Sequence, residues 1–160
     1  AGAFLGNQYA LQDTPVIGTF PNAAVAGGIV YCSSDIVNAS GTDLGAGSTL
    51  HCGKLPKGAV PLYTRVTPLL GSSGVPTVLA NAVIFNFGYT GDTNALGVTT
   101  TFASSAVPQA IAPIPDGTVD TGQAPLTSAK DIFATSSVAE LVATEALKVE
   151  IYYTVAGKTV

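Results

Sequence analysis

The feature that most constrains this chain is a strict alternation of large apolar and polar side chains near its C-terminus. The apolar side chains occupy every second position: Leu147, Val149, Ile151, Tyr153 and Val155. Successive side chains of a β-strand point to opposite faces of the sheet, so this period of two predicts a strand with one buried face. Such a face needs a second layer to pack against.

Two earlier segments, Val60–Thr67 and Ala82–Tyr89, show the same alternation. A Gly-Asp-Thr-Asn run at residues 91–94 follows the second segment, and these residue types favour tight turns. The inward positions of the three strands predict a core, which consists of Val60, Leu62, Val66, Val83, Phe85, Phe87, Val149, Ile151 and Tyr153.

The rest of the chain predicts further short strands separated by turns. We expect these strands at Gly28–Val37, Thr49–Gly53, Leu96–Phe102 and Asp131–Val138. The segment Val138–Lys148 contains helix formers, but we expect a turn followed by a strand. Prolines exclude Ala103–Ala124 from a central strand. The fold class is therefore all-β: a β-sandwich or jelly roll of about seven to nine antiparallel strands, with no long helix.

The N-terminal region predicts an extended arm before a single β-domain. A chain of 160 residues forms one domain with a real core. Ala1–Phe20 carries apolar side chains without periodicity, and Gly27-Gly28 marks the end of a hinge, so we divide the chain into an arm (1–27) and a β-sandwich domain (28–160). Apolar groups of this kind need a surface to dock on. The predicted partner-binding residues of the arm are Phe4, Leu5, Tyr9, Leu11 and Phe20.

Charge is scarce, which bears on the partners of this protein. Charged residues make up 10% of the chain, whereas about 25% is typical of globular domains. Either the protein has a neutral Thr/Ser surface, or other subunits cover much of it. Three charge-free tracts favour coverage by subunits: Thr14–Ser34, Val66–Gly91 and Thr93–Pro115.

The composition also argues against two classes of partner. The sequence contains no run of ~18 apolar residues, so it predicts no membrane-spanning helix. A net charge of −4 with scattered basic residues argues against nucleic-acid binding. The first residues lack the basic region of a secretory signal peptide.

The cysteines and the single histidine do not predict a reactive site. Cys52 follows His51 directly, and adjacent strand residues point to opposite faces. We therefore expect Cys52 in the core and His51 on the surface. If the chain turns near Thr42, Cys32 and Cys52 are cross-strand neighbours, and we expect both to be reduced because cytosolic disulfides are rare.

No other motif predicts catalysis, a metal or a cofactor. Gly91–Asn94 resembles the start of a calcium loop but lacks the later ligands, so it is read as a hairpin turn. The Gly-rich runs at 45–48 and 71–74 lack the Lys of a phosphate loop. Glu140, Glu145 and Glu150 recur every five residues, a spacing that places them together on neither a helix nor a strand face. We expect a non-enzymatic protein.

Three of these elements together resemble a class of tailed-phage head proteins. They are the turn Lys54–Ala59, the turn Gly88–Ala95 and the closing strand Lys148–Tyr153. The resemblance implies a virion structural protein of the capsid decoration or cement type, which bridges and stabilises neighbouring major capsid subunits of a bacteriophage head. It implies residence in the host cytoplasm before assembly and on the outer surface of the head afterwards. The expected partners are the major capsid protein and further copies of this chain in a homotrimer, with a dimer as the alternative.

A second function class remains open from the sequence. A secreted binding module, or an adhesin or pilus-type subunit, is also built from β-sandwiches. Carbohydrate-binding modules usually expose an aromatic platform, whereas this chain has no Trp and six Tyr. A pilus-type subunit would need a missing strand that a donor supplies.

Overall fold

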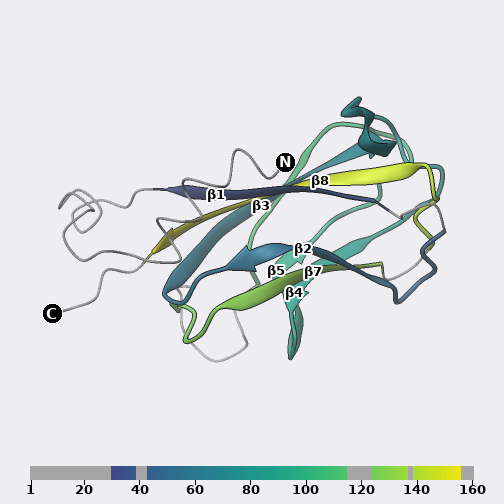
Figure 1. Cartoon of the computed structure of the whole chain (residues 1–160). Coiled ribbons are helices and arrows are strands. Elements are labelled where there is room, and N and C mark those ends of the chain that lie inside the picture. The colour runs from purple at the N-terminus through teal and green to yellow at the C-terminus, as the bar shows by residue number, and fades with distance from the viewer. Residues whose placement is uncertain (1–29, 39–42, 115–123, 137–138, 156–160) are drawn as a thin grey trace, which may run out of the picture.

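Eight strands in two four-stranded antiparallel sheets form the computed structural model of this chain (Figure 1), which describes residues 30–38, 43–114, 124–136 and 139–155. The strands are β1 (Tyr31–Asn38), β2 (Thr49–Leu55), β3 (Ala59–Leu70), β4 (Phe85–Tyr89), β5 (Asp92–Val98), β6 (Gln109–Ile111), β7 (Lys130–Ser136) and β8 (Glu145–Val155). Helix among these residues is limited to a short 3-10 turn, η1 (Gly71–Ser73). The all-β prediction of about seven to nine strands is confirmed.

The strand order identifies the sandwich as a jelly roll. One sheet has the order β1-β8-β3-β6 and the other β2-β7-β4-β5. The antiparallel pairs β1–β8, β2–β7, β3–β6 and β4–β5 are nested along the chain. The first four strands therefore run back along the last four, and successive pairs fall alternately into the two sheets. Such a double-sheet wrap is the jelly-roll architecture.

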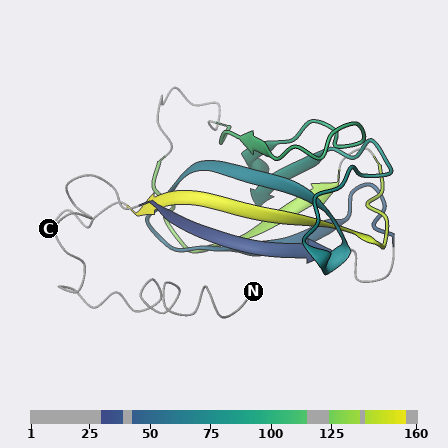
Figure 2. The same cartoon turned by 90° about the horizontal axis from the view of Figure 1, so that it is seen from above.

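Strand β8 lies inside the first sheet, between β1 and β3 (Figure 2). It pairs with β1 from Ala146 to Tyr153 and with β3 along its whole length. Its inward row of Leu147, Val149, Ile151 and Tyr153 is buried, as the alternation predicts.

The first residues of β3 depart from the predicted core. Val60 is half-buried and Leu62 is 40% exposed, so the prediction that both lie in the core is wrong. A β-bulge between Pro61 and Tyr63 inserts Leu62 as an extra residue opposite β8. A bulge shifts the side-chain alternation by one position, which explains why Pro61 is buried before the bulge and Val66 after it.

The aromatic half of the core comes from the second sheet. Phe85 and Phe87 of β4 are fully buried together with Val83, as predicted.

The bounds of β4 and β5 differ from the prediction. Strand β4 begins at Phe85 rather than Ala82, and β5 begins at Asp92, so the turn between them is shorter than predicted. Strand β5 ends at Val98 instead of continuing to Phe102.

Strands β1 and β2 do not pair with each other. The prediction that Thr49–Gly53 returns beside the first strand is wrong, because β1 and β2 belong to different sheets. Each instead forms the edge of its own sheet and pairs with a late strand, β8 or β7. In this jelly roll, each pair of consecutive strands crosses between the two sheets, except β4 and β5, which form a hairpin.

The segment that contains helix formers forms a turn and a strand, as predicted. In its described part, Ala143 and Thr144 form a turn and β8 begins at Glu145. The buried Glu145 carboxylate accepts hydrogen bonds from the backbone N–H of Ala80 (2.6 Å) and of Val142 (3.0 Å). This one side chain therefore holds two loops against the end of β8.

Among the described residues, no helix has the length and apolar character needed to cross a membrane.

The contrast between Phe85 and Leu62 gives a test of the core. We expect Phe85→Ala to lower the free energy of unfolding by roughly 3–5 kcal/mol, because it leaves a cavity between the sheets. Leu62→Ala removes a side chain that the bulge turns outward, and its cost should stay within about 0.5 kcal/mol. Urea unfolding monitored by circular dichroism measures both, and similar costs for the two variants would contradict the register of β3.

The Glu145 clamp gives a second stability test. Glu145→Gln keeps the shape but exchanges one acceptor oxygen for an NH₂ group, so one of the two backbone N–H groups loses its partner. We expect a loss of about 1–3 kcal/mol in the free energy of unfolding. The control is Glu140→Gln, because Glu140 is exposed. Equal stability of the two variants would contradict the clamp.

Candidate interaction surfaces

The described residues hold no cluster of side chains suited to metal binding, in the sense of three His, Cys, Asp or Glu side chains in one place. His51 lies on the surface, where Nε2 is 3.6 Å from a carboxylate oxygen of Asp131 and the ring makes an edge contact with Phe133. Cys52 points the opposite way and is buried. The predicted placements of His51 and Cys52 are confirmed.

The two cysteines belong to strands of different sheets, so the prediction that they are cross-strand neighbours is wrong. Cys32 pairs with Tyr152 on the outer face of its sheet, whereas Cys52 lies in the core. Burial raises the pKa of the Cys52 thiol to about 12, and burial followed by the charge of Glu150 raises the pKa of Cys32. Both thiols are therefore protonated near neutral pH and are poor nucleophiles. Their reduced state stays a prediction.

The outer face of the first sheet carries an aromatic surface, here called the tyrosine patch: Leu62, Tyr63 and Tyr152. The rings of Tyr63 and Tyr152 stack at 4.4 Å between centroids and 15° between planes. The bulge in β3 exposes Leu62 and Tyr63 side by side, at 40% and 39%. Stacked aromatic side chains with a polar tip are typical anchors of protein interfaces. The sequence alternation hid this patch, because it assigned Leu62 to the core.

An ion network lies next to the tyrosine patch on the same face. The Glu150 carboxylate lies 2.9 Å from Lys148 Nζ and 3.9 Å from Arg65 Nη1. Arg65 is paired with Glu150 in the ladder, two positions from the Tyr63–Tyr152 pair and on the same face. Surface ion pairs contribute little stability, about 0–1 kcal/mol. A mixed aromatic and charged surface of this kind is instead typical of an interface with a polar rim.

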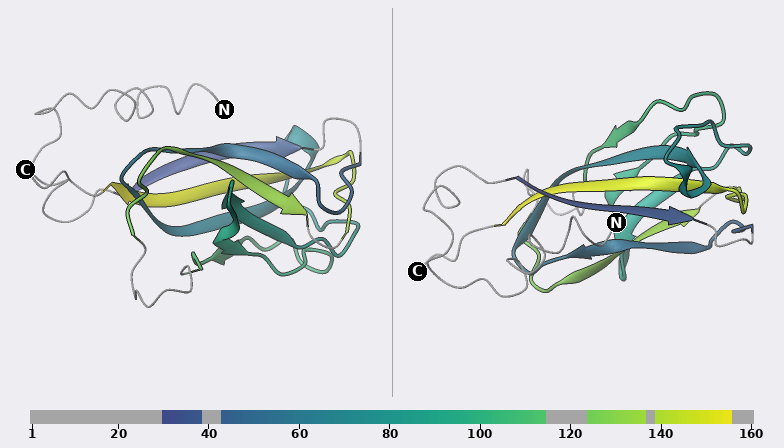
Figure 3. Two further views of the ribbon diagram at one scale, coloured as in Figure 1. Left: turned by 90° about the horizontal axis from the view of Figure 1, so that it is seen from below. Right: turned by 45° about the horizontal axis from the view of Figure 1, so that its top comes forward.

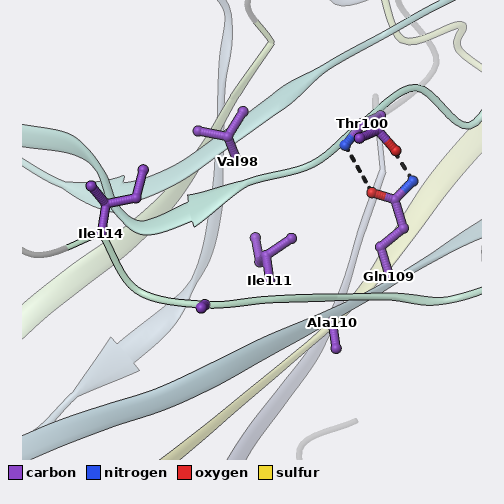
Figure 4. A pocket seen from close by; sticks show the side chains of 7 residues that line it. Val98, Thr100, Gln109, Ala110, Ile111 and Ile114 are labelled. Atoms are coloured by element: carbon purple, nitrogen blue, oxygen red, sulfur yellow. Dashed lines mark hydrogen bonds between the residues drawn. The ribbon is translucent and has the colours of Figure 1, made fainter.

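A second surface lies between the edge strands β5 and β6, and is here called the β5–β6 groove. It is an open pocket of about 550 Å³ (Figure 4), lined by Val98, Thr100, Gln109, Ala110, Ile111, Ala112 and Ile114. None of these side chains is charged. The sequence signal for it was faint: the groove lies within the charge-free tract Thr93–Pro115.

Local contacts link the two sides of the groove. The Gln109 amide accepts a hydrogen bond from Thr100 N–H (2.8 Å) and donates one to the Thr100 carbonyl (3.3 Å) (Figure 4). Gly97 has φ +112°, and a Cβ there would lie 2.5 Å from the Ala112 carbonyl oxygen. Glycine is therefore required where β5 approaches the segment that follows β6.

The predicted arm residues lie outside the described part of the chain. They are Phe4, Leu5, Tyr9, Leu11 and Phe20, and the division at residue 27 lies outside it as well. The description begins at the exposed Val30, directly before β1. The arm and its partners stay predictions.

Comparisons with known proteins find similarity in fold. A chain of the capsid asymmetric unit of cyanophage Pam1 superimposes with a TM-score of 0.55 and 18% identity, over 81% of this chain and 86% of that chain. A chain of the capsid of Ralstonia phage GP4 superimposes with a TM-score of 0.55 and 14% identity, over 91% and 94%. No family model matches the sequence. No curated protein matches it either.

The raised pKa of Cys52 predicts a pH dependence of stability. The folded state favours the neutral thiol, whereas the unfolded thiol titrates near its ordinary value of 9.0. The resulting stabilisation is complete below pH 9 and is lost as the pH rises towards about 12. Between these values the free energy of unfolding should fall by up to about 1.4 kcal/mol per pH unit from this group. Urea unfolding at pH 8–11 should show a shallower fall in Cys52→Ala; parallel curves would contradict the assignment.

Proposed function

We propose that this protein is a decoration or cement protein of a tailed-phage head, which bridges and stabilises neighbouring major capsid subunits. The observation that carries the proposal is the match to a chain in the GP4 capsid over nearly the whole of both chains. The match covers 94% of that chain, so the GP4 chain consists almost entirely of this fold. Fold alone does not imply function, so the surface chemistry of this chain supplies the second argument.

The surfaces of the described part suit assembly better than catalysis. The tracts Val66–Gly91 and Thr93–Pro115 carry no charged side chain. The tyrosine patch offers a compact aromatic anchor beside the Arg65–Glu150–Lys148 network. An aromatic anchor with a polar rim supports affinity and register for a protein partner. In this proposal the tyrosine patch contacts the major capsid protein on the outer surface of the head.

The arm is proposed to strengthen the assembly. Docking an arm costs backbone entropy, and burial of its large apolar side chains opposes that cost. These side chains are Phe4, Leu5, Tyr9, Leu11 and Phe20. A deep apolar surface buries them most completely, and a neighbouring subunit offers one more readily than this small sandwich does. The proposed assembly is a homotrimer, with a dimer as the alternative, formed in the host cytoplasm before the protein joins the virion.

A secreted binding module or adhesin is the alternative, and one observation favours it. Jelly rolls also occur in lectins, and the exposed Tyr63 is an aromatic surface of the kind that binds sugars. Against this, one face of the Tyr63 ring is occupied by Tyr152. Binding to immobilised glycans without binding to phage heads would favour the alternative.

Co-sedimentation with phage heads tests the proposal. Heads of the encoding phage, assembled without this protein, are mixed with the purified full-length chain and pelleted. We expect saturable binding, and we expect Tyr63→Ala to weaken it at least tenfold, because interface aromatic side chains often contribute 2 kcal/mol or more. Removal of residues 1–20 should also reduce binding.

The matched control for Tyr63→Ala is Val75→Ala. Val75 is 56% exposed and lies beyond the far end of β3, away from the tyrosine patch. Wild-type protein that stays in the supernatant at all concentrations would overturn the proposed function. Equal binding by wild type and Tyr63→Ala would exclude the tyrosine patch as the contact.

A further inference from the structure

We infer that the β5–β6 groove receives the N-terminal arm of a neighbouring copy of this chain, so that copies join edge to edge in a closed ring. The inference rests on the proposed function for the assembly role of the arm, and it adds the receiving site and the direction of the exchange.

The groove has the chemistry of a receptor for an apolar, uncharged segment. Val98 and Ile114 flank it, exposed at 38% and 40%, and the nearly buried Ile111 contributes to its wall. The polar group that Gln109 brings to the groove is already engaged with Thr100. A charged or strongly polar ligand therefore finds little to recognise, whereas aliphatic and aromatic side chains find a contact surface.

The backbone around the groove suits an added strand. β5 and β6 are the last strands of their respective sheets. An edge strand presents backbone N–H and C=O groups on its outer side, and an extended segment can pair with them. One backbone group on the edge of β5 is already paired within the chain: the Ala95 carbonyl accepts a hydrogen bond from Ile114 N–H at 3.1 Å.

Residues 1–29 match the groove in charge and in length. Asp13 is their single charged side chain, and their apolar groups are spread along the segment. Twenty-nine residues reach up to about 95 Å when extended, at ~3.3 Å per residue. The width of a four-stranded sheet is only about 15 Å, at ~4.8 Å between strands. The arm is thus long enough to reach a groove on another subunit.

The position of β1 selects a neighbour's groove over the chain's own. β1 and β6 lie at opposite edges of the same sheet (Figure 2). To reach its own groove across that sheet, the arm would have to cover the charged row of Arg65, Glu150 and Lys148. A neighbour placed edge to edge brings its β5–β6 groove next to the root of the arm. The contact joins two different surfaces, the arm of one copy and the groove of the next, and is therefore heterologous. Heterologous contacts generate a ring when the rotation between neighbouring copies closes.

Photo-crosslinking of the full-length protein tests this inference. Ile114→benzoylphenylalanine places the crosslinker at the rim of the groove. Val75→benzoylphenylalanine is the control, since Val75 is also exposed and follows η1, which lies at the end of the sandwich opposite the start of β1 (Figure 3). Light and ¹⁵N-labelled chains are refolded together, irradiated and digested, and crosslinked peptides are identified by mass spectrometry.

We expect crosslinks from position 114 to residues 1–29, with light–heavy peptide pairs at the frequency of random mixing. The Val75 control should give no enrichment of arm peptides. Crosslinks that join only chains of the same isotope would show that the arm binds its own groove and would overturn the exchange. Crosslinks from position 114 to other regions, or equal arm crosslinks from position 75, would overturn the site.

A charge substitution provides a second readout. Ile114→Glu places a carboxylate in the neutral groove and should shift the oligomer to monomer in size-exclusion chromatography with light scattering. Val75→Glu should leave the oligomer unchanged, and circular dichroism confirms folding of both. An oligomer that persists in folded Ile114→Glu would overturn the inference. These experiments use no phage heads, so a crosslinked ring that fails to bind heads would defeat the proposed function alone.

Discussion

The two ladders that β8 forms, with β1 on one side and β3 on the other, are the constraint on which the rest of the structure depends. Both partners come from the first half of the sequence, so these ladders close the largest loops of the chain. The inward row of β8 then supplies the floor of the core against which Phe85 and Phe87 pack from the second sheet. Without β8, the first sheet would separate into β1 alone and the β3–β6 pair.

The jelly-roll wrap determines where this protein can make contacts. Because early strands pair with late ones, β1 and β2 lie at one side of the sandwich and β5 and β6 at the other. One side therefore carries the start of β1, from which the proposed arm would extend, and the other carries an uncharged groove. The broad outer face between them holds the tyrosine patch. The proposed bridging of several subunits rests on these separate surfaces.

Two polar side chains, the buried Glu145 and the half-buried Gln109, hold loops in place. Glu145 holds two loops against β8 through backbone N–H groups, and Gln109 links β6 to the segment after β5. The buried Thr64 hydroxyl is the exception, since among the described residues it has no hydrogen-bond partner. Glu145 and Gln109 order loops without adding a charge to the neutral tracts Val66–Gly91 and Thr93–Pro115.

The alternation of side chains determined the strands and their faces for much of this protein. Leu147–Val155 and Phe85–Phe87 were assigned correctly because period two is a local property of an extended backbone. The same local rule failed at Leu62, where a bulge in the ladder with β8 inserted one residue and reversed the faces. It also could not choose partners: β1 and β2 are close in sequence yet fall into different sheets, because pairing is decided by packing across the whole chain. The tyrosine patch and the β5–β6 groove are products of those long-range choices, so only the tertiary structure could reveal them.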